Sequence, residues 1–600
     1  MSRRSEWLAL GVLLAAIGLL HGHGLSFGFF FDDSNHLELC AKNGYGDLAG
    51  GNRFDWTRSI ARAWWVAEET GWAYFRPIPV AIRTACLQCF GLDPLPFHVV
   101  HLFLYTAVVM SFYGLLRRLG IGLKPALAGG LLFTLNPTHA VVSPWLANDT
   151  TILTALGYIW GIWLMRASAD ADHRRPLLAL GACACYALTL LSRESGLMLG
   201  PILVMFDWLG RRTSSRPWKL YFLLTFEGVG YLVLRSLMLE AAPLPRSPYF
   251  HWPSEGGFAS WISYKVLSDA VCLTLGLPFV PIAQVPWLQA RPIATALAVG
   301  GGLSVLALFA YPLRRSRVLW GILGGMALAA APTICVFSAA YNYFLLSAGW
   351  AALLAVWAAA LGPRRPRLVS AAFAFLVCSY LVGSWSTVRQ MRASAYADQL
   401  VREEVLATEP QNYPPGTKLF FLNLPLFACE VGPAVRLATG RDDLEFFPLT
   451  LAPEPFAPRR IAEIHREGDR TLLVRMDGDG WFAGPFGEQV QLGWFGSSRS
   501  RLPNGFVNLW PGAGPMPFQV EVVEAGPRGI RALRFTFDKP LEDPSYRFFI
   551  GNPTHLAQQW HPSGMPTGRS QDPYTSVLNG RIQRMQMGVD FVDGWLASCP

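Results

Sequence analysis

The sequence predicts a polytopic α-helical membrane protein with about eleven transmembrane helices, followed by a mainly β domain outside the cytoplasm. Three observations predict this fold class. The 600 residues are 52% hydrophobic and only 15% charged, whereas soluble proteins average about 25% charged residues. Apolar segments recur as far as residue 386, and short runs of alternating apolar and polar residues follow them.

The apolar segments have lengths near the roughly 20 residues that cross about 30 Å of hydrocarbon. The first follows Ser2-Arg3-Arg4 and lacks a small-x-small cleavage site, so we interpret it as a retained helix rather than a secretory signal. The candidate spans are residues 7–27, 97–116, 123–143, 150–165, 177–191, 195–209, 219–238, 292–313, 318–337, 341–361 and 368–386.

Basic residues gather at alternate ends of these spans, as at Arg3-Arg4, Arg117-Arg118 and Arg364-Arg365. Because Lys and Arg accumulate in short cytoplasmic loops, the N-terminus is predicted inside. The net charge of +9 therefore reflects topology, and we expect no nucleic-acid partner. We expect an integral protein of a bacterial inner or plasma membrane, in contact with membrane lipids.

This topology places every long segment on the non-cytoplasmic side. The membrane domain is predicted at 1–386, with extracytoplasmic loops at 28–96 and 240–291, and the C-terminal domain at 387–600. Apolar and aromatic residues at helical spacing predict interfacial helices over 55–74 and 258–275.

The C-terminal segment carries period-two patterns at 518–522, 533–537 and 546–550. Such patterns, separated by turn residues, indicate strands of a mostly antiparallel, sandwich-like domain. We predict a further strand at 418–424 and the end of a linking helix at 403–410.

The cysteines outside the predicted spans leave two disulfides open, since the non-cytoplasmic side permits them. One would join Cys40 to Cys86 or Cys89, and the other Cys429 to Cys599. Cys86 and Cys89 form a CxxC without a second pair or clustered His, so no metal site is predicted there.

Polar residues gather at the outer boundary of the predicted spans, where charges are costly and commonly functional. The first are the adjacent carboxylates Asp32 and Asp33, directly after Phe29-Phe30-Phe31. Each member on its own has the simpler interpretation of a helix cap, an ion pair or a core histidine. Their shared depth favours a common site. The other members are Arg76, Asn136, His139, Asn148, Asp149, Arg193 and Glu194.

The order of these motifs resembles membrane-embedded glycosyltransferases of the GT-C type. Within that type, the chain is similar to the protein O-mannosyltransferase-like group, which includes tetratricopeptide-bearing transmembrane mannosyltransferases; no such repeats follow here. The resemblance covers residues 27–209 well, the later spans weakly and the tail not at all. The segments that carry it are FDD (31–33), YFRPIPV (74–80), FGLDPLPFHVVHLFLY (90–105), LFTLNPTHAVVSPWLANDT (132–150) and LSRESGLMLGPILVMFDWL (191–209).

The resemblance implies transfer of a sugar, with inversion, from a polyprenyl-phosphate donor to an acceptor outside the cytoplasm. It makes Asp32 the general base and Asp33 a second acidic residue that positions acceptor or donor, although the two roles are interchangeable. Arg76 is the first candidate for binding the lipid phosphate, and the Arg193-Glu194 pair is the second. The acceptor is open between protein, lipid and polysaccharide.

Four further residues match a polar cluster that shapes the sugar or carrier pocket in the family: Asn136, His139, Asn148 and Asp149. Two departures stand out. The basic residue that precedes the acidic one in the family is Asn148 here, and the late acidic-Arg-Tyr segment is replaced by Tyr341-Asn342-Tyr343. We predict no metal ion and no cofactor.

Two other function classes compete with a transferase. A transporter or flippase of lipid-linked glycans would line its path with polar residues near the membrane midplane. A non-catalytic assembly factor of the cell envelope would use the membrane domain as an anchor for the exported tail.

Overall fold

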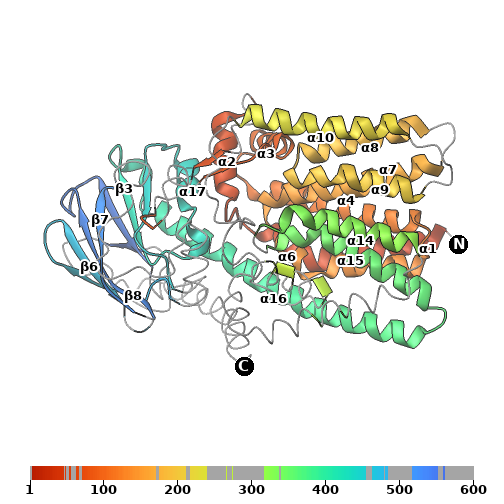
Figure 1. Cartoon of the computed structure of the whole chain (residues 1–600). Helices are drawn as coiled ribbons and strands as arrows, with labels where there is room; N and C mark the ends of the chain where they lie inside the picture. Colours follow the sequence, from red (N-terminus) through yellow and green to blue (C-terminus); the bar gives the residue numbers. More distant parts are fainter. Residues whose placement is uncertain are drawn as a thin grey trace.

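The computed structural model shows a helix bundle joined by one long helix to a β domain (Figure 1). It describes residues 3–45, 48, 53–55, 63–65, 71–170, 175–210, 217–239, 316–336, 339–453, 462–476, 478, 480–483, 516–526, 528–551 and 558–560, and a few single residues between 262 and 304. The predicted span at 292–313 and the predicted helix at 258–275 lie outside these ranges, apart from isolated positions. The N-terminus and the β domain lie at opposite ends of the bundle (Figure 1).

Helices in the bundle match the predicted spans throughout the described residues. Among the described residues, six helices are long and apolar enough to cross a membrane: α1 with η1, α4, α7 with η4, α10, α15 and α16. The membrane class is therefore confirmed, and the number of eleven spans stays a prediction. The bundle consists of α1 (Arg3–His21), η1 (Gly22–Ser26), α4 (Pro94–Arg118), α5 (Leu123–Leu135), α6 (Pro137–Val142), η4 (Leu146–Asn148), α7 (Asp149–Asp170), α8 (Arg175–Leu190), η5 (Glu194–Met198), α9 (Leu199–Gly210), α10 (Trp218–Met238), α14 (Arg317–Ala330), η7 (Ala331–Thr333), α15 (Ala340–Leu361) and part of α16 (Pro366–Leu406).

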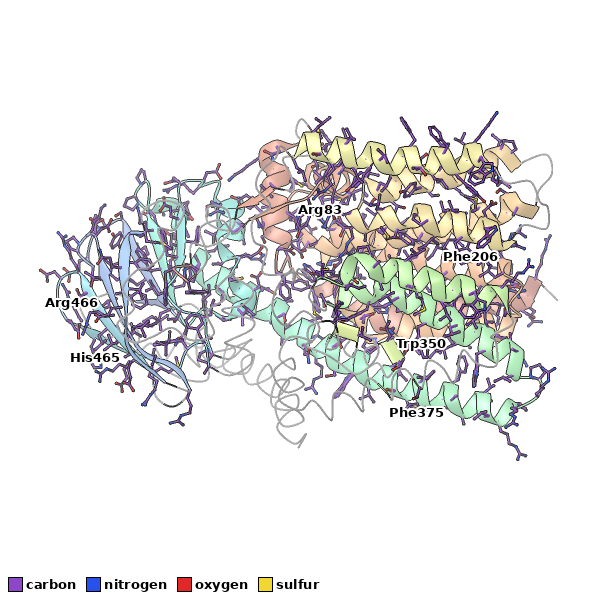
Figure 2. The ribbon with its side chains drawn as sticks, in the orientation of Figure 1. Arg83, Phe206, Trp350, Phe375, His465 and Arg466 are labelled. Atoms are coloured by element: carbon purple, nitrogen blue, oxygen red, sulfur yellow. The ribbon has the colours of Figure 1, made fainter. Side chains whose placement is uncertain are left out.

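Large apolar side chains lie both inside and outside this bundle. Phe133, Phe344 and Trp350 are buried in its core, whereas Phe222 and Phe375 are exposed on α10 and α16. Figure 2 shows Trp350 among the helices and Phe375 on α16. Exposed aromatic and aliphatic side chains along whole helices are what lipid contact requires.

The long helix α16 spans 41 residues, from Pro366 to Leu406. At 1.5 Å per residue it is about 60 Å long, which is roughly twice the hydrocarbon thickness. The predicted domain boundary at 386 therefore falls inside one continuous helix, and the helix predicted to finish at 403–410 ends at Leu406. Residues 387–406 contain neither Gly nor Pro, so nothing in them breaks the helix.

Two four-stranded sheets form the β domain. One has the order β5-β6-β8-β7 and is antiparallel, and the other has the order β10-β9-β3-β4. Phe420 of β3 packs against Phe537 of β8 with ring centroids 5.0 Å apart, so the sheets share a core. The strands are β3 (Lys418–Leu422), β4 (Glu445–Pro448), β5 (Ala462–Arg466), β6 (Thr471–Met476), β7 (Phe518–Gly526), β8 (Gly529–Phe537), β9 (Tyr546–Ile550) and β10 (Gln558–Trp560).

The predicted strands and their mostly antiparallel pairing are confirmed among the described strands, but the centre of the sheet around β3 departs from this pattern. This strand pairs in parallel with both β4 and β9. Parallel neighbours need a crossover connection, and between β3 and β4 this is made by η9 (Leu426–Ala428) and α17 (Val431–Thr439). A further 3-10 turn, η8 (Pro410–Asn412), connects α16 to β3.

The first long loop joins the bundle to the β domain. It contains α2 (Asp33–Asn43), β1 (Arg53–Asp55), β2 (Gly71–Ala73) and α3 (Pro77–Phe90). The interfacial helix predicted over 55–74 is wrong at both ends, because β1 and β2 pair there as an antiparallel ribbon. Trp64 and Trp65 instead enter the β-domain core, where the Trp64 indole N–H donates to the Leu449 carbonyl at 2.8 Å.

The disulfide that the sequence left open for Cys40 is not formed, since Cys40, Cys86 and Cys89 are all free thiols. Cys40 Sγ lies 4.0 Å from the carbonyl oxygen of Val80, more than one helical turn from Cys86 along α3. Cys429 is likewise a free thiol, and Cys599 lies outside the described residues.

Candidate active site

A sharp turn presents the acidic pair at the end of the bundle that faces the β domain. After η1 the chain runs to Phe31, which has a φ of 54°, and Asp32 then occupies the N-cap position of α2 without a capping hydrogen bond from its side chain. A bulky residue seldom adopts this left-handed conformation unless its surroundings hold it. The Phe31 ring stacks on Trp145 with centroids 4.9 Å apart, and this contact fixes the turn.

Asp33 points inward and is buried. Its Oδ1 accepts a hydrogen bond from the Ala147 backbone N–H at 2.9 Å, and its Oδ2 accepts one from the Phe30 N–H at 3.3 Å. Burial, together with the nearby Asp32 carboxylate, raises the pKa of Asp33 well above its usual range. Asp33 thus joins the turn to the segment before α7.

Asp32 is the accessible member of the pair, with 36% of its side chain exposed. Its Oδ1 accepts a hydrogen bond from the Trp145 indole N–H at 2.7 Å, and its Oδ2 lies 3.6 Å from His36 Nε2. Burial acts to raise the pKa of Asp32, but the hydrogen bond and charge of His36, with Trp145 and Arg83, hold it below its usual value. The ionised carboxylate is therefore held in place and still reachable.

A buried ion pair supports this arrangement from behind. Arg83 of α3 donates from Nε to Asp149 Oδ2 at 2.8 Å and from Nη2 to Asp149 Oδ1, and it also donates to the Ala147 carbonyl at 3.1 Å. Both side chains are 6% exposed. Asp149 is thus neutralised by Arg83, which Figure 2 places at the β-domain end of the bundle. Our sequence analysis missed Arg83, although an Arg among the apolar residues of 78–82 and 85–87 was a usable signal.

Arg76 and Glu194 form a second ion pair near Asp32. Arg76 Nη2 donates to Glu194 Oε2 at 2.7 Å, and its guanidinium lies 3.8 Å from the centre of the Tyr74 ring. Burial raises the pKa of Tyr74 to about 12, and the charges of Arg76, Glu194, Arg193 and Asp32 all act on this phenol. These four predicted site residues therefore all lie close enough to one tyrosine to influence it electrostatically.

Arg193 is held by neutral groups. Its Nη1 donates to Thr151 Oγ1, its Nη2 donates to Asn342 Oδ1 at 3.1 Å, and its guanidinium lies 5.1 Å from the Tyr341 ring centre. Burial, and then the charge of Arg76, lower the pKa of Arg193 to about 10. The charge of Glu194 acts on Arg193 as well, but within the described part of the chain no carboxylate forms a salt bridge with it, so an anionic ligand would stabilise its charge further.

A path of ring contacts connects Arg193 to Asp32. Trp145, which donates to Asp32, has its ring centre 6.0 Å from that of Tyr341, and Tyr341 lies under Arg193. An accessible carboxylate and a guanidinium without a carboxylate partner thus lie on the same aromatic wall.

Asn136 and His139 lie inside the bundle rather than on this wall. The Asn136 side chain accepts from the Thr138 N–H at 3.1 Å and thereby caps α6. His139 Nδ1 lies 2.9 Å from the Tyr105 hydroxyl, and its Nε2 lies 2.9 Å from Ser347 Oγ. These contacts are those of a cap and a core histidine, and a sugar-binding role for them stays a prediction.

Asn148 is buried at the end of η4, directly before Asp149. Its Nδ2 has no hydrogen-bond partner within the described part of the chain. This position, which is basic in the family that the sequence resembles, is thus polar and uncharged here. Arg83 brings the positive charge to Asp149 from another helix.

The β domain contributes an acidic residue that sequence analysis missed. Glu430 precedes α17 and is buried, and burial, followed by the charges of Asp32, Asp398 and Asp33, raises its pKa well above the usual range. Its position in a Gly- and Pro-containing loop gave no signal of proximity to Asp32, because α17 is brought there by the parallel crossover.

Comparisons with known proteins add a likeness of fold. No protein-family model and no curated protein matches this chain. An Archaeoglobus fulgidus oligosaccharyltransferase tethered with an acceptor peptide is 13% identical with a TM-score of 0.41, over 75% of this chain and 64% of that chain. ArnT from Cupriavidus metallidurans bound to undecaprenyl phosphate is 15% identical with a TM-score of 0.35, over 76% of this chain and 87% of that chain.

A third structure is the archaeal oligosaccharyltransferase AglB from Archaeoglobus fulgidus in complex with an inhibitory peptide and a dolichol-phosphate. It is 14% identical with a TM-score of 0.38, over 76% of this chain and 66% of that chain. This chain spans only about 64% of the first of the three structures. At such identities and TM-scores no residue role is transferred from them.

Proposed function

We propose that this protein is an inverting glycosyltransferase, a hexosyltransferase that moves a sugar from a polyprenyl-phosphate carrier to an acceptor hydroxyl on the non-cytoplasmic face of the membrane. One observation carries the proposal. The accessible, ionised Asp32 and the guanidinium of Arg193 share one wall at the end of a membrane-spanning bundle. This combination provides a base for a hydroxyl and a cation for a phosphate within reach of a lipid anchor.

The reaction assigns each group a definite task. The acceptor oxygen attacks the anomeric carbon from the face opposite the phosphate, and its proton passes to the free oxygen lone pairs of Asp32. The bond between the anomeric carbon and the phosphate oxygen breaks, and the electron pair leaves with the polyprenyl phosphate. Attack from the opposite face inverts the anomeric configuration.

The phosphate is better assigned to Arg193 than to Arg76, which reverses the order expected from the sequence. Arg76 already has a carboxylate partner in Glu194, so its charge is largely compensated. Arg193 has neutral partners, and burial lowers its pKa to about 10. A phosphate that gains charge as the bond breaks would therefore be stabilised most by Arg193.

The decisive test is Asp32→Asn. We expect transfer of labelled sugar from polyprenyl-phosphate hexoses to endogenous acceptor in membrane vesicles to fall by about 10²- to 10⁴-fold. The amide keeps the side-chain shape, so the protein should elute from size-exclusion chromatography in detergent as the wild type does. Glu463→Gln, at an exposed carboxylate of β5, is the matched control and should transfer normally.

Two results would count against the proposal in different ways. Undiminished transfer by Asp32→Asn would remove Asp32 from the role of base. A wild-type protein that consumes none of the mannosyl, glucosyl and galactosyl donors would argue against a hexosyltransferase.

A further inference from the structure

Two helices begin side by side at the candidate site, one from the first loop and one from the β domain. Arg436 of α17 donates to Glu38 of α2 from Nε at 2.6 Å and from Nη2 at 2.9 Å. Further along, Lys42 Nζ lies 3.2 Å from Asp442 Oδ1. Lys42 Nζ also lies 2.9 Å from Glu38 Oε1, and Asp442 follows the end of α17. At the other end of both helices the charges of Asp32 and Asp33 act on Glu430, so α2 and α17 run in the same direction.

This register places Glu430 beside Asp32. Arg436 is as far along the chain from Glu430 as Glu38 is from Asp32, and each acid directly precedes its helix. The β domain therefore brings a second carboxyl group to the end of α2 where Asp32 is held. Figure 1 shows α17 next to α2 at the junction of the two parts.

Glu430 is 6% exposed, and its Oε2 has no hydrogen-bond partner within the described part of the chain. The charged groups that act on it are carboxylates: Asp32 and Asp33 from the first loop and Asp398 from α16. The nearby cations interact with other carboxyl groups. Arg436 forms an ion pair with Glu38, and Arg83 forms one with Asp149. The charge of Arg402 acts on Asp398. His36 lies beside Asp32. Burial and these carboxyl groups raise the pKa of Glu430 well above its usual range, which favours its protonated form.

A neutral, buried carboxylic acid with an unused oxygen is costly unless a ligand completes its hydrogen bonding. Among the described residues, no group of three or more His, Cys, Asp or Glu is arranged to hold a metal ion. A hydroxyl-bearing acceptor at Asp32 fits, since it brings oxygen atoms that accept a hydrogen bond.

We propose that Glu430 is an acceptor-binding residue, a buried side chain of the β domain that donates a hydrogen bond to an acceptor oxygen next to the hydroxyl that Asp32 deprotonates. The proposal rests on the transferase function proposed above. It names the acceptor class as a molecule with a second oxygen close to its nucleophilic hydroxyl. In this proposal the membrane domain and the β domain each contribute a residue to one acceptor site.

The first test is independent of activity. Dicyclohexylcarbodiimide adds to protonated carboxyl groups in apolar surroundings, and the tryptic peptide Leu419–Arg436 contains Glu430 as its only acidic side chain. We expect mass spectrometry to find the adduct on this peptide at neutral pH, less of it at alkaline pH, and none in Glu430→Gln. An unlabelled wild-type peptide at neutral pH would show that Glu430 is ionised and would overturn the proposal.

The second test separates acceptor binding from chemistry at the donor. Glu430→Ala should lower transfer to endogenous acceptor by about fivefold to tenfold, while the release of sugar to water, measured with the same labelled donors, stays as in the wild type. Glu430→Gln can still donate and should transfer as the wild type does at neutral pH. Transfer by the wild type should fall at alkaline pH, where Glu430 ionises, and transfer by Glu430→Gln should not.

The outcomes distinguish the two proposals. If donor consumption depends on Asp32 but Glu430→Ala transfers normally, the acceptor-binding role is wrong and the transferase stands. If no donor is consumed at all, the transferase is wrong. An alkaline fall that is equal in the wild type and in Glu430→Gln would assign the titration to another group and overturn the role of Glu430.

Discussion

At the residue scale, environment gives two adjacent aspartates different tasks. Asp33 accepts from two backbone N–H groups and is buried, whereas Asp32 keeps 36% of its side chain exposed and is oriented by Trp145. The sequence predicted the pair but left the two roles interchangeable, because both side chains are chemically identical. The direction in which each points depends on the left-handed Phe31 and its stacking on Trp145, and no local pattern encodes that contact.

Also at the residue scale, the effects of removing Arg193 and Arg76 on donor binding can be compared. Arg193→Ala should raise the apparent KM for the lipid donor by about tenfold to a hundredfold, which is the range for a hydrogen bond to a charged group. Arg76→Ala should raise it less, because it removes a guanidinium that Glu194 already compensates. Initial rates at varied donor concentration measure both effects.

Arg76→Ala leaves the Glu194 carboxylate without its ion-pair partner. The control is the double variant Arg76→Ala/Glu194→Gln, which also removes the negative charge of Glu194. An unchanged donor KM in Arg193→Ala would show that the phosphate does not bind there. A larger effect for Arg76→Ala that persists in the double variant would restore the order expected from the sequence.

At the element scale, the joint between α3 and α7 depends on one buried ion pair. Removing one partner of such a pair typically costs about 3–5 kcal/mol, because the other charge stays buried. Arg83→Ala should therefore lower the melting temperature in detergent, and Arg83→Met combined with Asp149→Asn should recover part of the loss. Thermal unfolding followed by tryptophan fluorescence measures this, and a stable Arg83→Ala variant would contradict the pair's structural role.

Hydropathy predicted the spans because lipid imposes length and composition on a helix irrespective of its neighbours. It placed Trp64 at the membrane interface, where tryptophan is common, and the structure shows its indole bonded to Leu449 in the β domain. The same limit applies to Arg83 and Glu430. The role of each depends on a residue distant in the chain, Asp149 for Arg83 and Asp32 for Glu430. A single sequence does not show which distant residues lie together.

At the scale of the whole molecule, the candidate site lies where the bundle, the first loop and the β domain meet, away from the N-terminus (Figure 1). Three connections hold the β domain there: the unbroken α16, the Trp64 indole in the β-domain core, and the contact of α2 with α17. The position of Asp32 at the start of α2 thus depends on the β domain as well as on the bundle.

The contact of α2 with α17 gives the last prediction, which concerns this dependence. Glu38 and Arg436 are 4% and 7% exposed. Arg436→Ala removes the two-point partner of Glu38 and leaves this buried carboxylate to the half-exposed Lys42 at 2.9 Å. The variant should therefore reduce transfer and expose the linker after α16 to limited proteolysis. Asp442→Asn, at a side chain that is 71% exposed, is the matched control and should change neither, since exposed pairs contribute little. A double-mutant cycle with Glu38→Gln isolates the interaction. Additive losses in that cycle would mean that the pair does not couple the two parts, and that α16 and Trp64 suffice to position Asp32.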